Sequence, residues 1–225
     1  MDERFQRNIG AISGAEQELL LAKKAAIIGC GGLGCYSAEF LARIGIGHLT
    51  LIDGDVFTAS NLNRQLNSTE TNLGKKKASE AKQRLLNIRA GLSVKAADTL
   101  LTEENAEELL KNHDVIIDAL DNIETRLLIE KTAGNLGITL VHGAVEGWCA
   151  QVCTVFPGDS VLSMLYRRKG TNDKPPSVLS FAPAFCACIQ ASEAVKVLLN
   201  RTDILRKKLF TASLKDNSFS IVELC

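Results

Sequence analysis

The chain has 225 residues, of which 46% are hydrophobic and 23% are charged, and Lys+Arg and Asp+Glu both number 26. A net charge of zero gives no general attraction to DNA or to an anionic membrane, so phosphate binding must come from local basic residues. The amino terminus is charged, and no apolar stretch is long enough to span a bilayer. The composition therefore predicts a cytoplasmic globular protein.

Residues 1–22 are predicted to form a helical arm in two short pieces. From residue 23 onward, apolar strands alternate with helices. The expected strands are 24–29, 48–53, 93–97, 114–119 and 138–143, and the expected helices are 32–44, 75–89, 102–111 and 123–135. This alternation is typical of a Rossmann-like, doubly wound, mostly parallel α/β sheet, which we expect over residues 23–145 as a nucleotide-binding core.

The first strand ends in a glycine turn, Gly29-Cys30-Gly31-Gly32-Leu33-Gly34, and a helix follows. In this order, backbone N–H groups at the start of the helix can hold phosphate oxygens. Gly29 would allow the tight turn, Gly31 the close approach of a phosphate, and Gly34 the packing of the helix on the strand. The turn predicts nucleotide binding, but it suits NAD as readily as ATP.

The residues after the second strand narrow the choice of nucleotide. Asp53 ends that strand, where an acid can accept hydrogen bonds from ribose hydroxyls. Segment 54–77 is long and polar, as functional loops often are. It carries two amides and two cations, which are Asn61, Gln65, Arg64 and Lys77. These side chains suit a polyphosphate better than a dinucleotide.

A carboxylate follows a later strand. Asp121 comes after strand 114–119, at the edge where open α/β sheets bind their ligands. A single carboxylate beside phosphates is the usual way to hold Mg²⁺, which takes its other ligands from water and substrate. Asp121 or Asn122 can also cap helix 123–135. The set favours a nucleoside triphosphate with magnesium.

The alternation of strands and helices stops after residue 145. Strands are predicted at 147–156 and 161–166, followed by an exposed crossover loop at 166–177, a helix at 180–199 and a hairpin whose strands are 209–214 and 218–222. We expect residues 146–225 to continue the sheet with antiparallel strands, within a single domain that covers residues 1–225. Trp148 is expected in the core, and His142 as a structural, hydrogen-bonded histidine.

The motifs occur in a fixed order along the chain. They are Arg4-Phe5-x-Arg7, Gly29-x-Gly31-Gly32-Leu33-Gly34, Asp53-x-Asp55, Ser60-Asn61-Leu62-Asn63-Arg64-Gln65, Gly74-x-x-Lys77 and Asp121-Asn122-x-x-x-Arg126. This set resembles the ThiF/MoeB/HesA family, bacterial relatives of the ubiquitin-activating enzymes. The resemblance covers most of residues 4–156, and Ala182-Pro183 resembles a later segment of the family.

The resemblance implies an ATP-dependent adenylyltransferase. In that reading, ATP and Mg²⁺ are bound by the glycine turn with Leu33, and by Asp53, Asp55, Asn61, Arg64, Gln65, Lys77, Asp121 and Asn122. Asp121 would hold the metal, and Arg64, Lys77 and Asp121 would be catalytic together with Arg7, which would reach into the partner's site of a homodimer.

The substrate of most of the family is the C-terminal glycine of a small ubiquitin-like sulfur carrier, in thiamine, molybdopterin or related biosynthesis. Its carboxylate attacks the α-phosphorus of ATP, and pyrophosphate leaves. The carboxylate is already ionised at neutral pH, so no strong base is needed. Positioning and cations carry such a reaction.

The cysteines depart from the family pattern. The chain has seven, no Cys-x-x-Cys pair for structural zinc and none in the crossover loop. We therefore predict no zinc, no disulfide framework and no covalent enzyme intermediate. Cys149 and Cys153, like Cys186 and Cys188, lie in apolar sequence and are expected to be buried.

Two alternatives to a carrier-activating enzyme stay open. The first is a family member that activates a small-molecule or tRNA-borne carboxylate, such as a cyclic threonylcarbamoyladenosine dehydratase, although the neutral charge speaks against tRNA. The second is an NAD-dependent oxidoreductase, or a nucleotide-binding module without catalysis.

Overall fold

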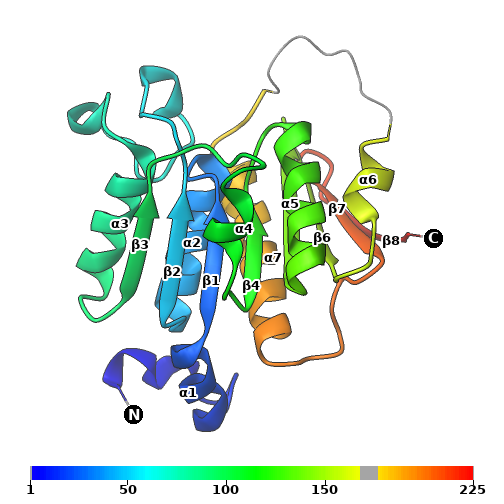
Figure 1. Cartoon of the computed structure of the whole chain (residues 1–225), viewed down its shortest axis with the longest axis horizontal. Coiled ribbons are helices and arrows are strands. Elements are labelled where there is room, and N and C mark those ends of the chain that lie inside the picture. Colours follow the sequence, from blue (N-terminus) through cyan, green and yellow to red (C-terminus); the bar gives the residue numbers. More distant parts are fainter. Residues whose placement is uncertain (1, 168–176, 225) are drawn as a thin grey trace.

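The strands form one mixed sheet of eight, in the order β3-β2-β1-β4-β5-β6-β7-β8, in a computed structural model that describes residues 2–167 and 177–224 (Figure 1). The strands are β1 Lys24–Ile28, β2 His48–Ile52, β3 Ser93–Ala97, β4 Val115–Asp118, β5 Thr139–Glu146, β6 Cys149–Val155, β7 Lys208–Ser213 and β8 Ser218–Glu223. Strands β1 to β5 pair in parallel, and β6 to β8 pair antiparallel. The mostly parallel sheet with antiparallel strands at its C-terminal side is thereby confirmed.

Helices cover both faces of the sheet. The helices are η1 Glu3–Asn8, α1 Gly14–Ala22, α2 Gly32–Ile44, η2 Ala59–Asn61, η3 Glu70–Asn72, α3 Lys77–Ile88, α4 Ala106–Leu110, α5 Ile123–Leu136, α6 Val161–Leu165 and α7 Phe181–Leu198. One hydrophobic cluster joins the sheet to α2, α3 and α7, and a second joins it to α4, α5 and α6. Figure 1 shows these two helix layers, one in front of the sheet and one behind it.

The two faces follow from the alternation of side chains along each parallel strand. Ala25 and Ile27 of β1 belong to the cluster with α2 and α7, whereas Ala26 and Ile28 belong to the cluster with α4 and α5. Successive side chains of a strand point to opposite faces, so a strand covered on both sides is mostly apolar along its whole length. That requirement explains the unbroken apolar runs in the sequence.

The order of the strands fixes the place of the site. The chain moves from β1 outward to β2 and β3, and then returns to place β4 on the other side of β1. The loops after β1 and β4 therefore leave the sheet in opposite directions and open a crevice at its carboxyl edge. The glycine turn and Asp121 meet in this crevice.

The helical arm lies at the opposite edge of the sheet, beside the amino ends of the strands (Figure 1). Ser13 caps α1 in a reciprocal arrangement with Glu16, which is why the helix begins at residue 14. Phe5 is buried and anchors η1, whereas Arg7 is exposed. The two short helical pieces expected for this arm are confirmed.

One predicted strand is wrong. Residues 161–165 form helix α6, although the sequence favoured a strand at 161–166. The Glu130 carboxylate accepts hydrogen bonds from the Leu162 N–H at 2.6 Å and the Ser163 N–H at 3.0 Å. These donors lie in the first turn of the helix, where N–H groups have no partner within the helix itself. The capping group comes from α5, so the local sequence does not contain it.

Helix α7 is long and apolar enough to pass a test for a membrane span by length and composition, with a mean hydropathy of 1.3. It packs against α2 and strands β5 and β6, and its Ala182, Cys186, Ala187 and Ala194 are fully buried. These contacts make it a core helix of the sheet. The predicted crossover loop at 166–177 lies mainly outside the described residues, which resume at Ser177.

Candidate active site

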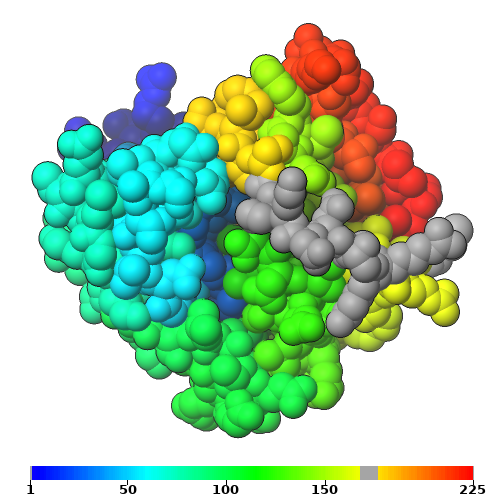
Figure 2. Space-filling model, turned by 90° about the horizontal axis from the view of Figure 1, so that it is seen from above, coloured from blue at the N-terminus to red at the C-terminus, as the bar shows by residue number. Residues whose placement is uncertain are grey.

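A pocket of about 740 Å³ opens at the carboxyl edge of the sheet. It runs from the glycine turn and β2 past β4 to the antiparallel strands β6, β7 and β8. Figure 2, which looks onto this edge, shows a hollow between the polar segment that follows β2, in cyan, and the segments that follow β3 and β4, in green. The pocket therefore spans both the parallel and the antiparallel halves of the sheet.

Steric contacts explain why two positions of the glycine turn require glycine. Gly29 has a φ of +93°, and a Cβ there would lie 2.7 Å from the Ala119 carbonyl oxygen. A Cβ on Gly34 would lie only 1.8 Å from the Gly29 carbonyl oxygen. Gly34 therefore permits the close packing of α2 on β1, as expected. Gly29, Gly31, Gly32 and Leu33 line the pocket, and Gly34 lies behind them.

Asp53 connects the glycine turn to the end of β2. Its carboxylate accepts hydrogen bonds from the Cys30 N–H at 2.6 Å and from the Asp55 N–H at 2.8 Å. It lines the pocket, as does Asp55. The role expected from the sequence was ribose binding, and the structure adds a second role, that of holding the turn in place.

Two cations converge on the pocket from the polar segment and α3. Lys77 is only 6% exposed at the start of α3, and its Nζ lies 2.9 Å from Asp55 Oδ2. Arg64 Nη1 donates to the Ser60 carbonyl at 3.0 Å and to Asn63 Oδ1 at 2.8 Å. Both cations line the pocket. Their charges lie near the glycine turn, where the expected phosphates would need them.

The two amides of the polar segment differ in their surroundings. Gln65 lines the pocket at 7% exposure, and its Oε1 has no hydrogen-bond partner within the described ranges 2–167 and 177–224. Asn61 is not part of the pocket wall. Its Oδ1 instead accepts the Thr58 N–H at 3.0 Å and closes η2. The structure therefore brings Gln65 to the candidate site and leaves Asn61 behind it, where it shapes the loop.

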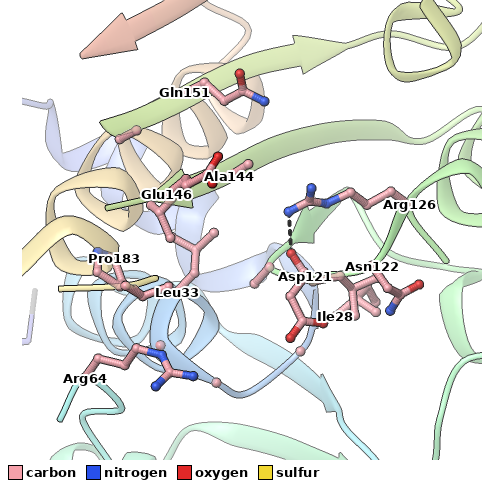
Figure 3. A pocket seen from close by; sticks show the side chains of 18 of the residues that line it. Ile28, Leu33, Arg64, Asp121, Asn122, Arg126, Ala144, Glu146, Gln151 and Pro183 are labelled. Atoms are coloured by element: carbon pink, nitrogen blue, oxygen red, sulfur yellow. Dashed lines mark hydrogen bonds between the residues drawn. The ribbon is translucent and has the colours of Figure 1, made fainter. Parts of the chain in front are cut away.

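Asp121 and Asn122 divide their tasks at the end of β4. Asn122 caps α5, with its Oδ1 accepting the Thr125 N–H at 2.8 Å. The Asp121 carboxylate is exposed in the pocket and has no hydrogen-bond or ion-pair partner among the residues that the structure describes. Figure 3 shows Asp121 and Arg64 on different sides of the pocket, with Arg126 approaching the Asp121 turn from α5. A capped helix thus leaves the Asp121 carboxylate available to a ligand.

The nearby cysteines and the tryptophan differ partly from expectation. Cys153 and Cys186 are buried as expected, and burial raises the pKa of the Cys186 thiol to about 12. Cys149 and Cys188 are exposed, which corrects the expectation for both, and Cys149 lines the pocket. Trp148 is 44% exposed and not in the core, because it lies in the turn between β5 and β6.

Several pocket residues carry no signal in the sequence. They are Leu100, Glu146, Cys149, Gln151, Tyr166, Ser213, Ser218 and Ser220. Most of them come from β6, β7 and β8. Side chains alternate between the two faces of a strand, so every second residue of these strands can face the pocket. Only the register of the antiparallel strands, such as Cys149 opposite Ser213, brings them to one wall. No motif in the sequence states that register.

The fold and the pocket define an α/β nucleotide-binding protein whose sheet is extended by antiparallel strands. The chain belongs to the ThiF family, whose model matches residues 5–224.

Among curated proteins, the chain is 31% identical to a SAMP-activating enzyme E1 of Haloferax volcanii, over 98% of this chain and 84% of that one. It is 34% identical to a molybdopterin-synthase adenylyltransferase of Haemophilus influenzae, over 81% of this chain and 77% of that one. It is 35% identical to a sulfur carrier protein ThiS adenylyltransferase of Bacillus subtilis, over 88% of this chain and 61% of that one.

Solved structures agree with the fold. Crystal structures of Escherichia coli MccB superpose with TM-scores up to 0.87, at 20% identity over the whole of this chain and 72% of that one. PaaA superposes with a TM-score of 0.82 at 24% identity, over 99% of this chain and 82% of that one. These identities are low, so the likeness concerns the fold alone.

Proposed function

We propose that this chain is an ATP-dependent adenylyltransferase that activates the C-terminal glycine carboxylate of a small ubiquitin-like sulfur carrier. The observation that carries the proposal is the continuous pocket. It joins the glycine turn, Arg64 and Lys77 at one end to the open wall of β6 to β8 at the other. A nucleotide and an extended protein tail can lie in it together. The relatives named as adenylyltransferases of sulfur carriers support this assignment.

The nucleotide end of the pocket suits ATP. Apart from its chain neighbours, the nearest described atom to a Cβ on Gly31 would be Gln65 Nε2 at 3.4 Å, so the backbone there is open to a phosphate. Arg64 and Lys77 supply positive charge. The Oε1 of Gln65, which has no partner in the part of the chain that the structure describes, is a buried acceptor that a hydroxyl or amino group of the nucleotide would satisfy. Exposed Leu100 beside Gly54 offers an apolar surface for the base.

The donor set suits Mg²⁺ brought in by ATP. Within residues 2–167 and 177–224, Asp121 is an exposed carboxylate with no hydrogen-bond or ion-pair partner, and no cluster of three or more metal-ligating side chains occurs. One carboxylate with phosphates and waters is the usual environment of Mg²⁺, so Asp121 would hold it. When bound, the metal would offset the negative charge of the phosphates. Arg64 and Lys77 would add to this effect at the leaving pyrophosphate.

The chemistry of the proposal requires positioning more than proton transfer. The carrier carboxylate, ionised at neutral pH, would attack the α-phosphorus, an O–P bond would form, and the bond to pyrophosphate would break. Fixed cations reduce the repulsion between two anions and stabilise the charge on the leaving group. Lys77, held at 2.9 Å by Asp55, needs little rearrangement to do so.

The far end of the pocket suits a protein tail. Gln151 and the hydroxyls of Ser213, Ser218 and Ser220 line it, and these groups can bond to an extended backbone. Trp148 and Phe181 lie next to this end with 44% and 42% exposure, and their ring centroids are 5.0 Å apart. An exposed apolar pair at the mouth favours a protein partner over a tRNA.

Arg7 can take part only across a subunit interface. It lies in η1, at the amino edge of the sheet, whereas the pocket opens at the carboxyl edge (Figure 1). The proposal therefore includes a homodimer in which Arg7 reaches the pocket of the partner. An apolar groove of about 520 Å³ between the arm, α2 and α7 supports a surface for a second copy.

The proposed location is the cytoplasm. All six cysteines of residues 2–167 and 177–224 are free, which suits a reducing compartment.

The direct test is ATP–pyrophosphate exchange with radiolabelled pyrophosphate. We expect exchange that depends on a carrier ending in Gly-Gly, and its loss in a carrier lacking the last glycine. Asp121→Ala should abolish exchange without unfolding the protein. Full exchange in Asp121→Ala would contradict the metal role. Nicotinamide-dependent turnover without exchange would contradict the function itself.

A second test concerns the absence of a covalent intermediate. Cys186→Ala and Cys188→Ala should leave exchange and adenylate formation intact. The structure adds Cys149 to the set, because it is the exposed thiol of the pocket wall. Cys149→Ala should also retain exchange. A thioester-linked carrier on gels that disappears in Cys149→Ala would overturn this part of the proposal.

A further inference from the structure

A buried hydrogen-bonded network lies behind the Asp121 turn and reaches the pocket wall at Tyr166. The Tyr166 hydroxyl lies 3.0 Å from Arg126 Nη1 and 3.1 Å from both Gln151 Nε2 and His142 Nε2. His142 Nδ1 in turn lies 2.6 Å from Asp118 Oδ2, and both of those side chains are fully buried. Tyr166 directly follows α6 and lines the pocket.

Counting donors and acceptors assigns the protons of this network. A tyrosine hydroxyl has one proton and two lone pairs, and both Arg126 and Gln151 Nε2 can only donate. The hydroxyl must therefore donate to His142 Nε2. That nitrogen carries no proton, so Nδ1 carries it and donates to Asp118. All hydrogen-bonding positions of the hydroxyl are used, which fixes its place.

The electrostatics of the buried pair agree with this assignment. Burial lowers the pKa of His142 and outweighs the hydrogen bond to Asp118, which raises it. Burial alone would raise the pKa of Asp118, but the hydrogen bond from His142 and the charge of Arg126 together hold that pKa below its ordinary value. A neutral histidine and an ionised aspartate result.

The network continues from Tyr166 to the turn that presents Asp121. Arg126 Nη2 donates to the Leu120 carbonyl, and Asp118 Oδ1 accepts the Leu120 N–H at 3.0 Å. Both backbone polar groups of the residue before Asp121 are thus held. The Arg126 guanidinium lies 5.3 Å from the centroid of the Tyr166 ring, so the ring restrains it as well. Figure 3 shows Arg126 extended toward this turn.

We propose that Tyr166 is a positioning residue for the Asp121 carboxylate, acting through Arg126 and the Leu120 carbonyl. The inference rests on the proposed site for ATP and Mg²⁺. Asp121 has no side-chain partner within residues 2–167 and 177–224, where its orientation follows from the turn that Arg126 and Asp118 hold at Leu120. Without the Tyr166 hydroxyl, Arg126 loses an acceptor and holds Leu120 less firmly. Partners that orient a metal ligand change metal affinity by on the order of tenfold or more.

The test is a binding titration that needs neither carrier nor turnover. Mn²⁺ is titrated into protein with ATP and followed by electron paramagnetic resonance. Tyr166→Phe should raise the Kd for Mn²⁺ by on the order of tenfold. Its affinity for ATP without metal should stay unchanged. In exchange assays, the Mg²⁺ needed for half-maximal rate should rise, and saturating Mg²⁺ should restore the rate.

Ser163→Ala is the matched control. It deletes one hydroxyl from the same helix, at the end where Ser163 Oγ lies 2.6 Å from Glu130 Oε2. The hydrogen bond lost is similar, but among the described residues Ser163 bonds to Glu130, whereas Leu120 bonds to Asp118 and Arg126. We expect the metal affinity of this variant to equal that of the unchanged protein. A similar rise in Kd in both variants would mean general loosening of α6 and would overturn the proposal.

A double variant tests the path through Arg126. Arg126→Lys keeps the charge but cannot bridge Tyr166 and Leu120, so it should raise the Kd for Mn²⁺ by itself. Adding Tyr166→Phe to it should change little, because the two residues act in series. Additive effects would overturn the path. If Tyr166→Phe does not fold, Gln151→Leu removes one bond to the hydroxyl and should shift the Kd in the same direction by less. No shift in that folded variant would also overturn it.

The two proposals fail in different ways. If the unchanged protein binds Mn²⁺ with ATP, and the variants bind it equally well, the positioning role is wrong and the adenylyltransferase stands. If the variants shift as expected but no carrier supports exchange, the function is wrong and the positioning role stands.

Discussion

The absence of a Cβ at Gly34 allows the close packing of the glycine turn. We predict that Gly34→Ala costs on the order of 4 kcal/mol in the free energy of unfolding, because the new Cβ would lie 1.8 Å from a backbone oxygen that cannot move freely. Chemical denaturation measures the loss. Gly134→Ala is the control, since Gly134 lies inside α5 and a new Cβ there would meet no described atom within 4 Å beyond its chain neighbours and the backbone of its own helix. The free energy of unfolding of this variant should rise by about 0.5–1 kcal/mol. Equal effects at both positions would refute the steric argument.

His142 makes stability depend on pH. Its folded pKa lies below its ordinary value of 6.5, so the unfolded chain takes up the proton first as the pH falls. The stability that His142 contributes is complete above about pH 7 and is lost as the pH falls from there toward the folded pKa. Over this range the free energy of unfolding falls by no more than about 1.4 kcal/mol per pH unit. Burial also lowers the pKa of His113, which adds in the same direction.

The contribution of His142 can be isolated with His142→Asn. This variant should be less stable at about pH 8, because the bonds to Asp118 and Tyr166 change. Its stability should then fall less steeply between about pH 7 and 5.5 than that of the unchanged chain. Urea unfolding at several pH values gives both slopes. Parallel slopes would assign the pH dependence to other groups.

At the scale of elements, the sequence predicts what its own residues determine. Helix 32–44 has the bounds that its flanking glycines predict. Gly31 precedes its first residue, and Gly45 ends it in a left-handed conformation. The buried runs of the parallel strands follow from two covered faces. Helix α6 could not be predicted, because Val161–Leu165 is apolar enough for a strand and the capping Glu130 lies about thirty residues earlier.

We predict that Glu130→Gln loosens α6. An amide of the same shape keeps one acceptor but turns a donor toward N–H groups that already need an acceptor, at a cost of about 2–3 kcal/mol. Hydrogen exchange at the Leu162 and Ser163 amides should become faster. Glu108→Gln, which removes only an exposed pair with Lys111, should leave both stability and exchange nearly unchanged. Unchanged protection at Leu162 in Glu130→Gln would show that another contact holds the helix.

At the scale of the whole molecule, the proposed homodimer predicts complementation. Arg7→Ala and Asp121→Ala should each abolish or strongly reduce exchange. When the two variants are mixed and allowed to exchange subunits, half of the dimers are mixed, and each has one pocket with both residues intact. About a quarter of the original activity should return. No recovery, although mixed dimers form, would place Arg7 outside the partner's site.

The nucleotide half of the pocket was largely predictable, and the far half was not. Asp121 follows β4, and Arg64 and Lys77 lie in the long polar segment after β2 and at the start of α3. Parallel strands bring all their carboxyl ends, and the segments that follow them, to one edge. Asn61 shows the limit even there, because a motif residue can shape the loop instead of facing the ligand. Ser213 and Ser218 come from antiparallel strands whose register depends on pairing over long distances in the chain.

The two cysteines in and just after the glycine turn can be used to measure how often the turn opens. Cys30 and Cys35 are buried, the Cys35 Sγ lies 2.8 Å from the Cys30 carbonyl oxygen, and burial raises the pKa of both thiols, that of Cys35 to about 12. A thiol reagent should label exposed Cys149 at once, and Cys30 and Cys35 only when the turn transiently opens. Their slow labelling rate then measures the free energy of that opening, and any ligand that occupies the turn should slow it in proportion to its affinity.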